Sequence, residues 1–267
     1  MSEEPHMLVE VVENIIIATF NRPDKLNAMS PQLLEILEAA VHRYRDTPEL
    51  RVMLINSKGR YFSAGADLKQ GNAENRPPLT RGSQVREQHR KLPMRRIWDE
   101  MEGIEKPFVV AHHARCVGGS LEMSLSCDFR LAAQNASYAF PEAKFGVLPA
   151  TNGISRLVRI IGPHWARYMI MANIPLEAHE ALNAGLVHKV FPDETFADDV
   201  MAFCRHLAKQ DGELVGAAKV AIELANDLPS HQAALVERLV NSSIMISPHQ
   251  KELMAAHLAG IGKGKGY

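Results

Sequence analysis

Short apolar runs that alternate with helical patterns over the first 190 or so residues are the feature that most constrains how this chain can fold. Residues 7–12 and 14–20 have the composition of two strands of a hairpin that turns near Glu13. After Pro192 nearly the whole sequence has a helical pattern instead. Further strand-like runs lie at residues 51–57, 106–113, 128–133 and 186–191. The sequence therefore predicts an α/β core over residues 1–195 and a helical region over residues 196–267.

Helix-capping residues sharpen some of these boundaries. Ser30 is an expected N-cap, and Pro31 suits the first helical position of the segment that follows. Gly185 is the expected C-terminal cap of a helix formed by "EAHEALNAGL". An apolar stripe predicts another helix over residues 84–103, whereas residues 58–83 have the composition of loops.

Composition excludes several classes of protein. The chain has 267 residues, with 30 basic and 31 acidic ones, so no broad basic field is available for nucleic acid. Its three cysteines are too few for a disulfide framework, and none lies in a CxxC pair. No stretch reaches the roughly 18 apolar residues that a membrane helix needs. With an acidic start, "MSEEPHMLVE", we expect a cytoplasmic protein with no membrane partner.

Two carboxyl groups lie in unusually apolar surroundings. Glu122 stands between Leu121 and Met123, and Glu142 follows Pro141. If Ser120 caps a helix, Glu122 lies in its first turn, where a negative charge complements the helix dipole. The segment "VGGSLEMSLS" offers no consistently polar face, however, so Glu122 should be buried. Burial raises the pKa of a carboxyl group, which is how proteins make general acids.

Two glycine-containing segments could supply backbone N–H groups near these acids. Gly118 and Gly119 precede Glu122 beside an expected helix N-terminus, a natural place for a developing negative oxygen. The segment "SAGAD", residues 63–67, is a second such loop, although it could equally be a plain tight turn. The residues alone thus indicate a possible oxyanion site with nearby carboxyl groups.

Five segments in order carry a family resemblance, from about Ile15 to Phe191. They are "FNRPDKLNAMS", "FSAGADLK", "GGSLEMSLSCD", "FPEAKFGVLP" and "EALNAGLVHKV". In these segments the chain resembles the crotonase superfamily, the enoyl-CoA hydratase/isomerase family. The resemblance implies a ββα-spiral core followed by a helical trimerisation region, and a homotrimer or a dimer of trimers.

The resemblance also implies a ligand. It would be an acyl-CoA thioester whose carbonyl oxygen is held by the N–H groups of Ala66 and Gly119, with coenzyme A present as part of the substrate and no tightly bound cofactor or metal. By that resemblance Asp67 and Lys69 would contact the adenine end of coenzyme A, although a solvated loop accounts for them nearly as well. The other positions that the resemblance assigns to the substrate or coenzyme A are Lys25, Leu26, Ala64, Leu68 and Gly118.

The acids select the reaction within such a family. The chain resembles the hydratases of this family in having glutamate at both positions. By that resemblance Glu122 would remove a proton from the water that attacks C3, and Glu142 would supply a proton to C2. We therefore expect an enoyl-CoA hydratase, a lyase. The alternatives are an enoyl-CoA isomerase that uses Glu142 alone, a hydroxyacyl-CoA dehydratase acting on a polar acyl group, and a non-catalytic acyl-CoA-binding paralogue.

Three departures from the family pattern bear on that expectation. Ala150, Thr151 and Asn152 replace most of a glycine-rich segment; Thr151 and Asn152 could bind a polar acyl substituent or, as we favour, cap a helix beginning near Ile154. "AHHARCVGG" replaces the usual N-G-x-A-x-G-G-G, and we expect His112 and His113 to be structural. The C-terminus lacks the family's usual ending, so no coenzyme A contact is expected from Lys263 or Lys265.

Overall fold

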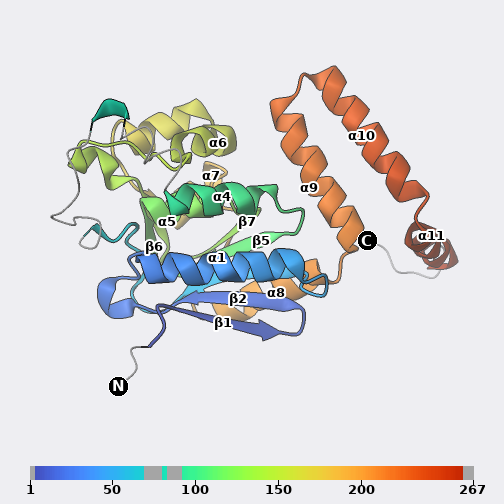
Figure 1. Ribbon diagram of the computed structural model, residues 1–267, viewed down its shortest axis with the longest axis horizontal. Coiled ribbons are helices and arrows are strands. Elements are labelled where there is room, and N and C mark those ends of the chain that lie inside the picture. The colour runs from blue at the N-terminus through green and yellow to red at the C-terminus, as the bar shows by residue number, and fades with distance from the viewer. Residues whose placement is uncertain (1–3, 69–79, 83–91, 261–267) are drawn as a thin grey trace. The chain divides into compact units, whose positions relative to one another are not determined.

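The computed structural model describes residues 4–68, 80–82 and 92–260 (Figure 1). The chain divides into two compact units, Met1–Lys209 and Gln210–Tyr267. This division lies one helix later than the predicted boundary after residue 195. Helix α8 (Phe196–Ala208) belongs to the first unit, because its residues Phe196, Val200 and Cys204 are buried in one apolar cluster with strand residues of the first unit.

Six strands of the described residues form the larger sheet of the first unit, in the order β1-β2-β3-β5-β7-β10. The predicted hairpin is confirmed, since β1 and β2 pair antiparallel and Glu13 has a φ of +58° in the turn. The remaining neighbours pair in parallel. These strands are β1 (Met7–Val12), β2 (Ile15–Phe20), β3 (Val52–Ser57), β5 (Phe108–His112), β7 (Phe129–Ala133) and β10 (Lys189–Phe191).

Both faces of this sheet are covered, which explains why its strands are continuous apolar runs rather than alternating ones. On one face β2 residues such as Ile16 pack in a cluster with Leu37 and Trp98, which lie on α1 (Pro31–Asp46) and α4 (Pro93–Gly103). On the other face Ile17 and its neighbours pack with α8. The predicted cap of α1 is confirmed, because the Ser30 side chain accepts a hydrogen bond from Leu33 N.

A second, four-stranded sheet was not predicted. It has the order β4-β6-β8-β9, and its strands are β4 (Tyr61–Ser63), β6 (Arg115–Val117), β8 (Ser137–Ala139) and β9 (Leu176–Glu177). Strands of two or three residues are too short for any periodicity to register in the sequence. Strands β3, β5 and β7 of the large sheet are each followed along the chain by a strand of the small one, namely β4, β6 and β8. This repeated step between two sheets winds the chain into a spiral.

Helices follow the strands of the small sheet. They are α5 (Gly119–Leu125) after β6, and the 3₁₀ helix η3 (Pro141–Phe145) and α6 (Gly153–Ile170) after β8. Helix α6 is interrupted at Gly162, which has non-helical dihedral angles and precedes Pro163. Helix α7 (Ala178–Asn183) ends before Gly185, whose φ of +79° agrees with the predicted cap. The 3₁₀ helix η1 (Pro23–Lys25) precedes α1.

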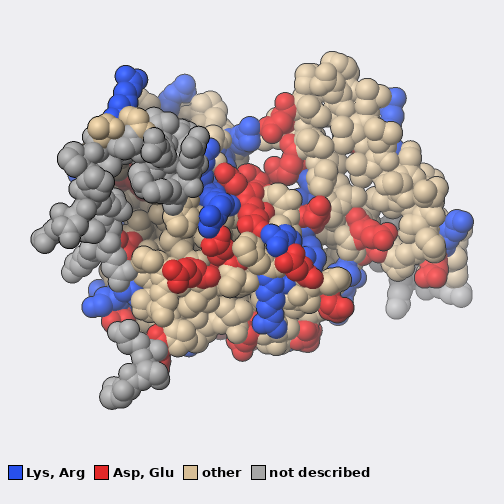
Figure 2. All heavy atoms as spheres, viewed as in Figure 1, with Lys and Arg blue, Asp and Glu red and all other residues tan. Residues whose placement is uncertain are grey.

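The second unit is helical, as predicted. Its helices are α9 (Gly212–Asp227), α10 (Ser230–Met245) and α11 (Pro248–Gly260), and Asp211 caps α9 by accepting a hydrogen bond from Leu214 N. None of the helices in the described ranges is long and apolar enough to cross a membrane. On the face drawn in Figure 2, basic and acidic side chains are intermingled, as the net charge of −1 leads one to expect.

Candidate active site

The two predicted oxyanion loops leave the small sheet side by side. Residues 64–67 follow β4, and Gly118 and Gly119 follow β6. Gly65 has a φ of +88°, and a Cβ atom placed on it would lie 2.7 Å from Val117 O and 3.2 Å from Gly119 N. The two loops therefore touch at Gly65, where both the space and the backbone conformation require glycine.

Ala66 and Gly119 are brought together at this contact. Ala66 forms an isolated parallel bridge with Met29, in which Met29 N donates to Gly65 O and Asp67 N donates to Met29 O. Such a bridge uses the groups on either side of Ala66, so the Ala66 N–H points to the other side. A Cβ atom on Gly119 would lie 3.6 Å from Ala66 N. Within the described part of the chain, neither the Ala66 nor the Gly119 N–H donates to another backbone group.

Glu122 lies in the first turn of α5, but Ser120 is not the cap of that helix. The N-cap residue is Gly118, which has a φ of +58°, and the helix begins at Gly119. The positive φ favours glycine at this position, and a Cβ atom on Gly118 would lie 2.8 Å from Glu142 Oε1, so that carboxyl group would have to shift. Glu142 thus packs against the loop that supplies the Gly119 N–H, and the Glu122 side chain is buried as predicted, with 4% of the residue exposed.

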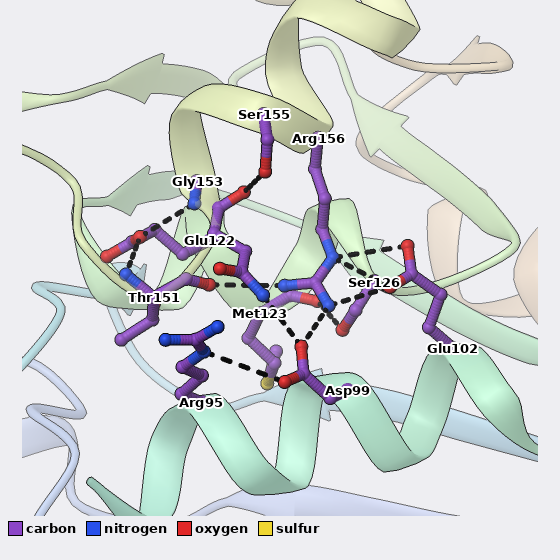
Figure 3. A network of polar contacts seen from close by, with 11 residues as sticks. Arg95, Asp99, Glu102, Glu122, Met123, Ser126, Thr151, Gly153, Ser155 and Arg156 are labelled. Atoms are coloured by element: carbon purple, nitrogen blue, oxygen red, sulfur yellow. Dashed lines mark hydrogen bonds and ion pairs between the residues drawn. The ribbon is translucent and has the colours of Figure 1, made fainter. Parts of the chain in front are cut away.

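The Glu122 carboxylate reaches the start of α6 (Figure 3). Its Oε2 accepts hydrogen bonds from Thr151 N at 2.8 Å and Gly153 N at 3.1 Å. Asn152 occupies the N-cap position of this helix, as expected, but neither its side chain nor that of Thr151 caps the helix with a hydrogen bond. Asn152 Nδ2 donates to Asp99 Oδ1 at 2.8 Å instead, and Thr151 Oγ1 has no hydrogen-bond partner among the described residues. Glu122 instead accepts the N–H group of Gly153, the first residue of α6.

The two carboxyl groups differ in what surrounds them. Burial raises the pKa of Glu122, while the Thr151 hydroxyl beside it and the N–H groups of Thr151 and Gly153 favour its ionised form and oppose that rise. Burial raises the pKa of Glu142 to about 7, and the nearby charge of Glu122 adds to the effect. Within the described residues Glu142 Oε2 has no hydrogen-bond partner. Two carboxyls whose surroundings differ in this way suit a division into a base and an acid.

A buried arginine that the sequence analysis missed holds the turn beside Glu122. Arg156 of α6 is 4% exposed; its Nη2 lies 2.7 Å from Asp99 Oδ1 and 2.7 Å from Glu102 Oε2, both on α4. Its Nη1 donates to Thr151 O at 3.1 Å (Figure 3). The available signal was the spacing of Asp99 and Glu102, three residues apart on one face of a predicted helix. That spacing did not indicate which basic residue would pair with the two acids, however.

The remaining predicted site residues differ in their surroundings. Leu26 has a φ of +51° and accepts a hydrogen bond from Ala64 N at 2.9 Å, which joins Leu26 and the end of η1 at Lys25 to the first oxyanion loop. Asp67 forms an ion pair with Arg22 Nη1 at 3.0 Å, so a contact of Asp67 with adenine would have to coexist with that pair. Leu68 is exposed. Lys69, Lys263 and Lys265 lie outside the described residues.

Two other groups near α5 have pKa values that suit a structural role. His112 is completely buried, and burial lowers its pKa to about 3, so its ring is neutral at physiological pH. Burial raises the pKa of the Cys116 thiol to about 12, which leaves it without the thiolate character that a nucleophile needs.

Comparison with known proteins agrees with this arrangement. A probable enoyl-CoA hydratase of Mycobacterium bovis, echA8, is 29% identical over 252 residues, which cover 94% of each protein. An (E)-benzylidenesuccinyl-CoA hydratase of Thauera aromatica is 29% identical over 248 residues, covering 91% of this chain and 92% of the relative. The crystal structure of an enoyl-CoA hydratase subunit I from Geobacillus kaustophilus superimposes with a TM-score of 0.87 at 30% identity, covering 97% of this chain and 96% of that one.

The fold of these relatives is the crotonase fold, so the predicted spiral α/β core is confirmed. A family model described as enoyl-CoA hydratase/isomerase matches residues 10–258, nearly the whole chain. With one buried and one partly buried glutamate and two touching glycine-containing loops at the positions where the sequence resembles that family, the chain belongs to the enoyl-CoA hydratase/isomerase family.

Proposed function

We propose that this protein is an enoyl-CoA hydratase, which adds water reversibly across the 2,3 double bond of an enoyl-CoA thioester. The observation that carries the proposal is the pair of carboxyl groups, Glu122 buried and Glu142 partly buried, beside the two glycine-containing loops. Glu122 is supported by two N–H donors, whereas Glu142 has a pKa raised to about 7 and an oxygen with no hydrogen-bond partner among the described residues. Hydration needs one base and one acid together, and this pair supplies both near neutral pH.

In the hydration direction Glu122 acts as the base. It takes a proton from water while the water oxygen attacks C3, and the electron pair of the double bond moves to the thioester carbonyl oxygen. Donation by the Ala66 and Gly119 N–H groups stabilises the resulting enolate. The protonated Glu142 then gives its proton to C2. The cycle closes when the proton on Glu122 returns to Glu142 through water, so that one water molecule is consumed for each product.

A double-bond isomerase is the second candidate, and one observation favours it. Glu122 accepts the N–H groups at the start of α6, so it has a structural role that would keep it in place without catalysis. Glu142 alone, with its raised pKa, could then carry a proton between two carbons of the acyl chain. A separate observation, the buried Thr151 hydroxyl without a hydrogen-bond partner among the described residues, would suit a substrate with a polar acyl substituent.

The test is the hydration of crotonyl-CoA by the purified protein, measured as loss of the absorbance of the conjugated thioester. Glu122→Gln and Glu142→Gln are each expected to lower kcat by about 10²-fold to 10⁴-fold, because each removes an acid–base group. Glu105→Gln is the matched control, since Glu105 is exposed on the surface after α4. Loss of activity in Glu142→Gln alone, with conversion of 3-enoyl-CoA to 2-enoyl-CoA, would support the isomerase. Tight thioester binding without either reaction would contradict both activities.

We also propose that the second unit mediates self-association as a trimer or a dimer of trimers. Large apolar side chains on α10 and just after it are strongly exposed, with Leu239 at 72% and Ile246 at 79%. Exposed apolar surface of this extent marks an interaction site. Sedimentation equilibrium should give three or six chains per particle for the wild type and a smaller assembly for Leu239→Glu combined with Ile246→Glu. A monomeric wild type would contradict the proposal.

A further inference from the structure

The Ser120 side chain joins the ends of two strands of the small sheet. Its Oγ accepts a hydrogen bond from Val117 N at 3.2 Å, and its single proton is shared between Val117 O at 2.8 Å and Ser63 O at 3.2 Å. Ser63 is the last residue of β4 and Val117 the last of β6. The pairing of these strands is irregular between Tyr61 and Ser63. The completely buried hydroxyl therefore bridges the two strands where their regular register is lost.

This bridge lies where both oxyanion loops begin. Residues 64–67 leave β4 at Ser63, and Gly118 and Gly119 leave β6 at Val117. The Ser63 hydroxyl extends the connection, because it accepts from Gly65 N at 3.1 Å and donates to Asn27 O at 2.8 Å. The separation of the Ala66 and Gly119 N–H groups thus depends on how β4 and β6 are held together at these two residues.

The carbonyl group of Ser120 is held by a hydrogen bond as well. Ser124 Oγ donates to Ser120 O at 2.8 Å. That bond uses the only proton of the Ser124 hydroxyl, so the 2.8 Å bond between Ser124 Oγ and His112 Nε2 must be donated by the histidine. His112 Nδ1 is then left to accept from Tyr138 OH at 3.3 Å. A neutral His112, as its lowered pKa requires, fits this chain of donors and acceptors.

We propose that Ser120 is a positioning residue that sets the separation of the two oxyanion N–H groups. The inference rests on the proposed function, because it needs a carbonyl oxygen to be bound between Ala66 and Gly119. Oxyanion donors work when they lie about 2.7–3.1 Å from the charged oxygen, so small shifts of either loop lower the rate. Misplacement of a reacting group by about 1 Å can cost about 100-fold. Ser120 acts on the transition state through these donors without touching the substrate.

The test compares Ser120→Ala with Ser126→Ala. Ser126 lies at the end of the same helix, is also buried, and donates only within its own turn, to Met123 O at 2.7 Å. Ser120→Ala is expected to lower kcat for crotonyl-CoA by about tenfold to 100-fold. KM should change by less than about twofold, because the ground-state carbonyl carries little charge. Ser126→Ala should keep the wild-type kcat. Ser120→Cys keeps the shape of the side chain but is a weak donor, so it should follow Ser120→Ala.

Two further measurements separate this inference from the proposed function. The first is the carbonyl stretching frequency of bound butyryl-CoA labelled with ¹³C at the thioester carbonyl. The N–H donors should lower this frequency in the wild type, and they should lower it by a smaller amount in Ser120→Ala. The second is amide hydrogen exchange of the unliganded protein. Exchange should become faster in residues 63–67 and 117–120 of Ser120→Ala and stay unchanged in Ser126→Ala.

Each outcome decides one of the two claims. Suppose that the wild type and Ser120→Ala lower the carbonyl frequency by the same amount and that Ser120→Ala keeps its kcat. This result overturns the positioning role and leaves the hydratase proposal intact. Faster exchange spread evenly over the first unit would make Ser120 an ordinary core residue and would also overturn the role. A wild type that neither hydrates crotonyl-CoA nor shifts the frequency of a bound thioester overturns the proposed function, and the positioning role with it.

Discussion

The Glu122 carboxylate forms the N-terminal cap of α6 by accepting a hydrogen bond from Gly153 N at 3.1 Å. An acid from α5 thereby satisfies an N–H group that a side chain of the preceding turn would ordinarily serve. The positive end of the α6 dipole in return favours the ionised form of Glu122. The same contact thus supports the helix and keeps the candidate base ready to accept a proton.

Gly153→Ala should damage this contact directly. A Cβ atom on Gly153 would lie 2.5 Å from Glu122 Oε2 and 2.9 Å from its Cδ, so the carboxyl group has to move. We expect kcat for crotonyl-CoA to fall by about 100-fold, because the base is displaced. We expect the free energy of unfolding to fall by about 1–3 kcal/mol. Gly103→Ala is the control, since a Cβ atom there meets nothing within 4 Å. Equal kcat values in the two variants would contradict the catalytic importance of this contact.

Arg156→Met should destabilise the first unit. The substitution removes the cation from Asp99 and Glu102 and leaves Thr151 O without its donor. A buried arginine whose partners are half exposed is expected to contribute roughly 2 kcal/mol, less than a fully buried pair. Urea unfolding monitored by circular dichroism measures the change. Arg95→Met is the control, because Arg95 lies 3.7 Å from the same Asp99 and is half exposed; it should cost below about 0.5 kcal/mol. An Arg156→Met variant as stable as Arg95→Met would refute this role.

The rate should depend on pH through the proton that the two glutamates share. Hydration needs ionised Glu122 with protonated Glu142, and dehydration needs the same single proton on the other carboxyl. Both directions should therefore show the same pH dependence. Because the pKa of Glu142 is about 7, kcat/KM should fall tenfold per pH unit well above that value. It should fall again in acid, where Glu122 is protonated too. Initial rates between pH 5 and 9 test this, and a rate that stays constant up to pH 9 would speak against Glu142 as the acid.

Glu142→Gln should stabilise the protein, and more so at higher pH. The pKa of Glu142 is raised from 4.5 to about 7 in the folded state, so the folded protein binds this proton more tightly than the unfolded chain. The stability that results is fully present below about pH 4.5 and is lost as the pH rises through about 7. Glutamine carries no charge at any pH. We expect the melting temperature of the variant to exceed that of the wild type by about 2 °C or more at pH 8, and by less at pH 5. A difference that does not grow with pH would rule out the raised pKa.

Local sequence patterns predicted the elements that are long enough to show a period or that carry a distinctive cap. The hairpin of β1 and β2, the Ser30 cap of α1, and Gly185 after α7 are all signalled within a few neighbouring residues. The small sheet was missed, since its strands have two or three residues and are defined by pairing with distant segments. The N-cap of α5 was placed two residues late, at Ser120 instead of Gly118, because Ser120 has the residue type of a cap but its hydroxyl is engaged with Val117 and Ser63.

The sequence by itself determined that Glu122 is buried in the first turn of a helix and that glycine-containing loops precede it. Burial and the start of a helix can be inferred from residues that are adjacent in the sequence. Only the tertiary structure decided what those groups meet. Thr151 N and Glu122 are 29 residues apart, and Ser120 and Ser63 are 57 apart. Arg156 and Asp99 are also 57 residues apart. Contacts at such separations depend on how the spiral brings β4, α4, α5 and α6 together. The residues next to each partner in the sequence do not indicate which distant residue it will contact.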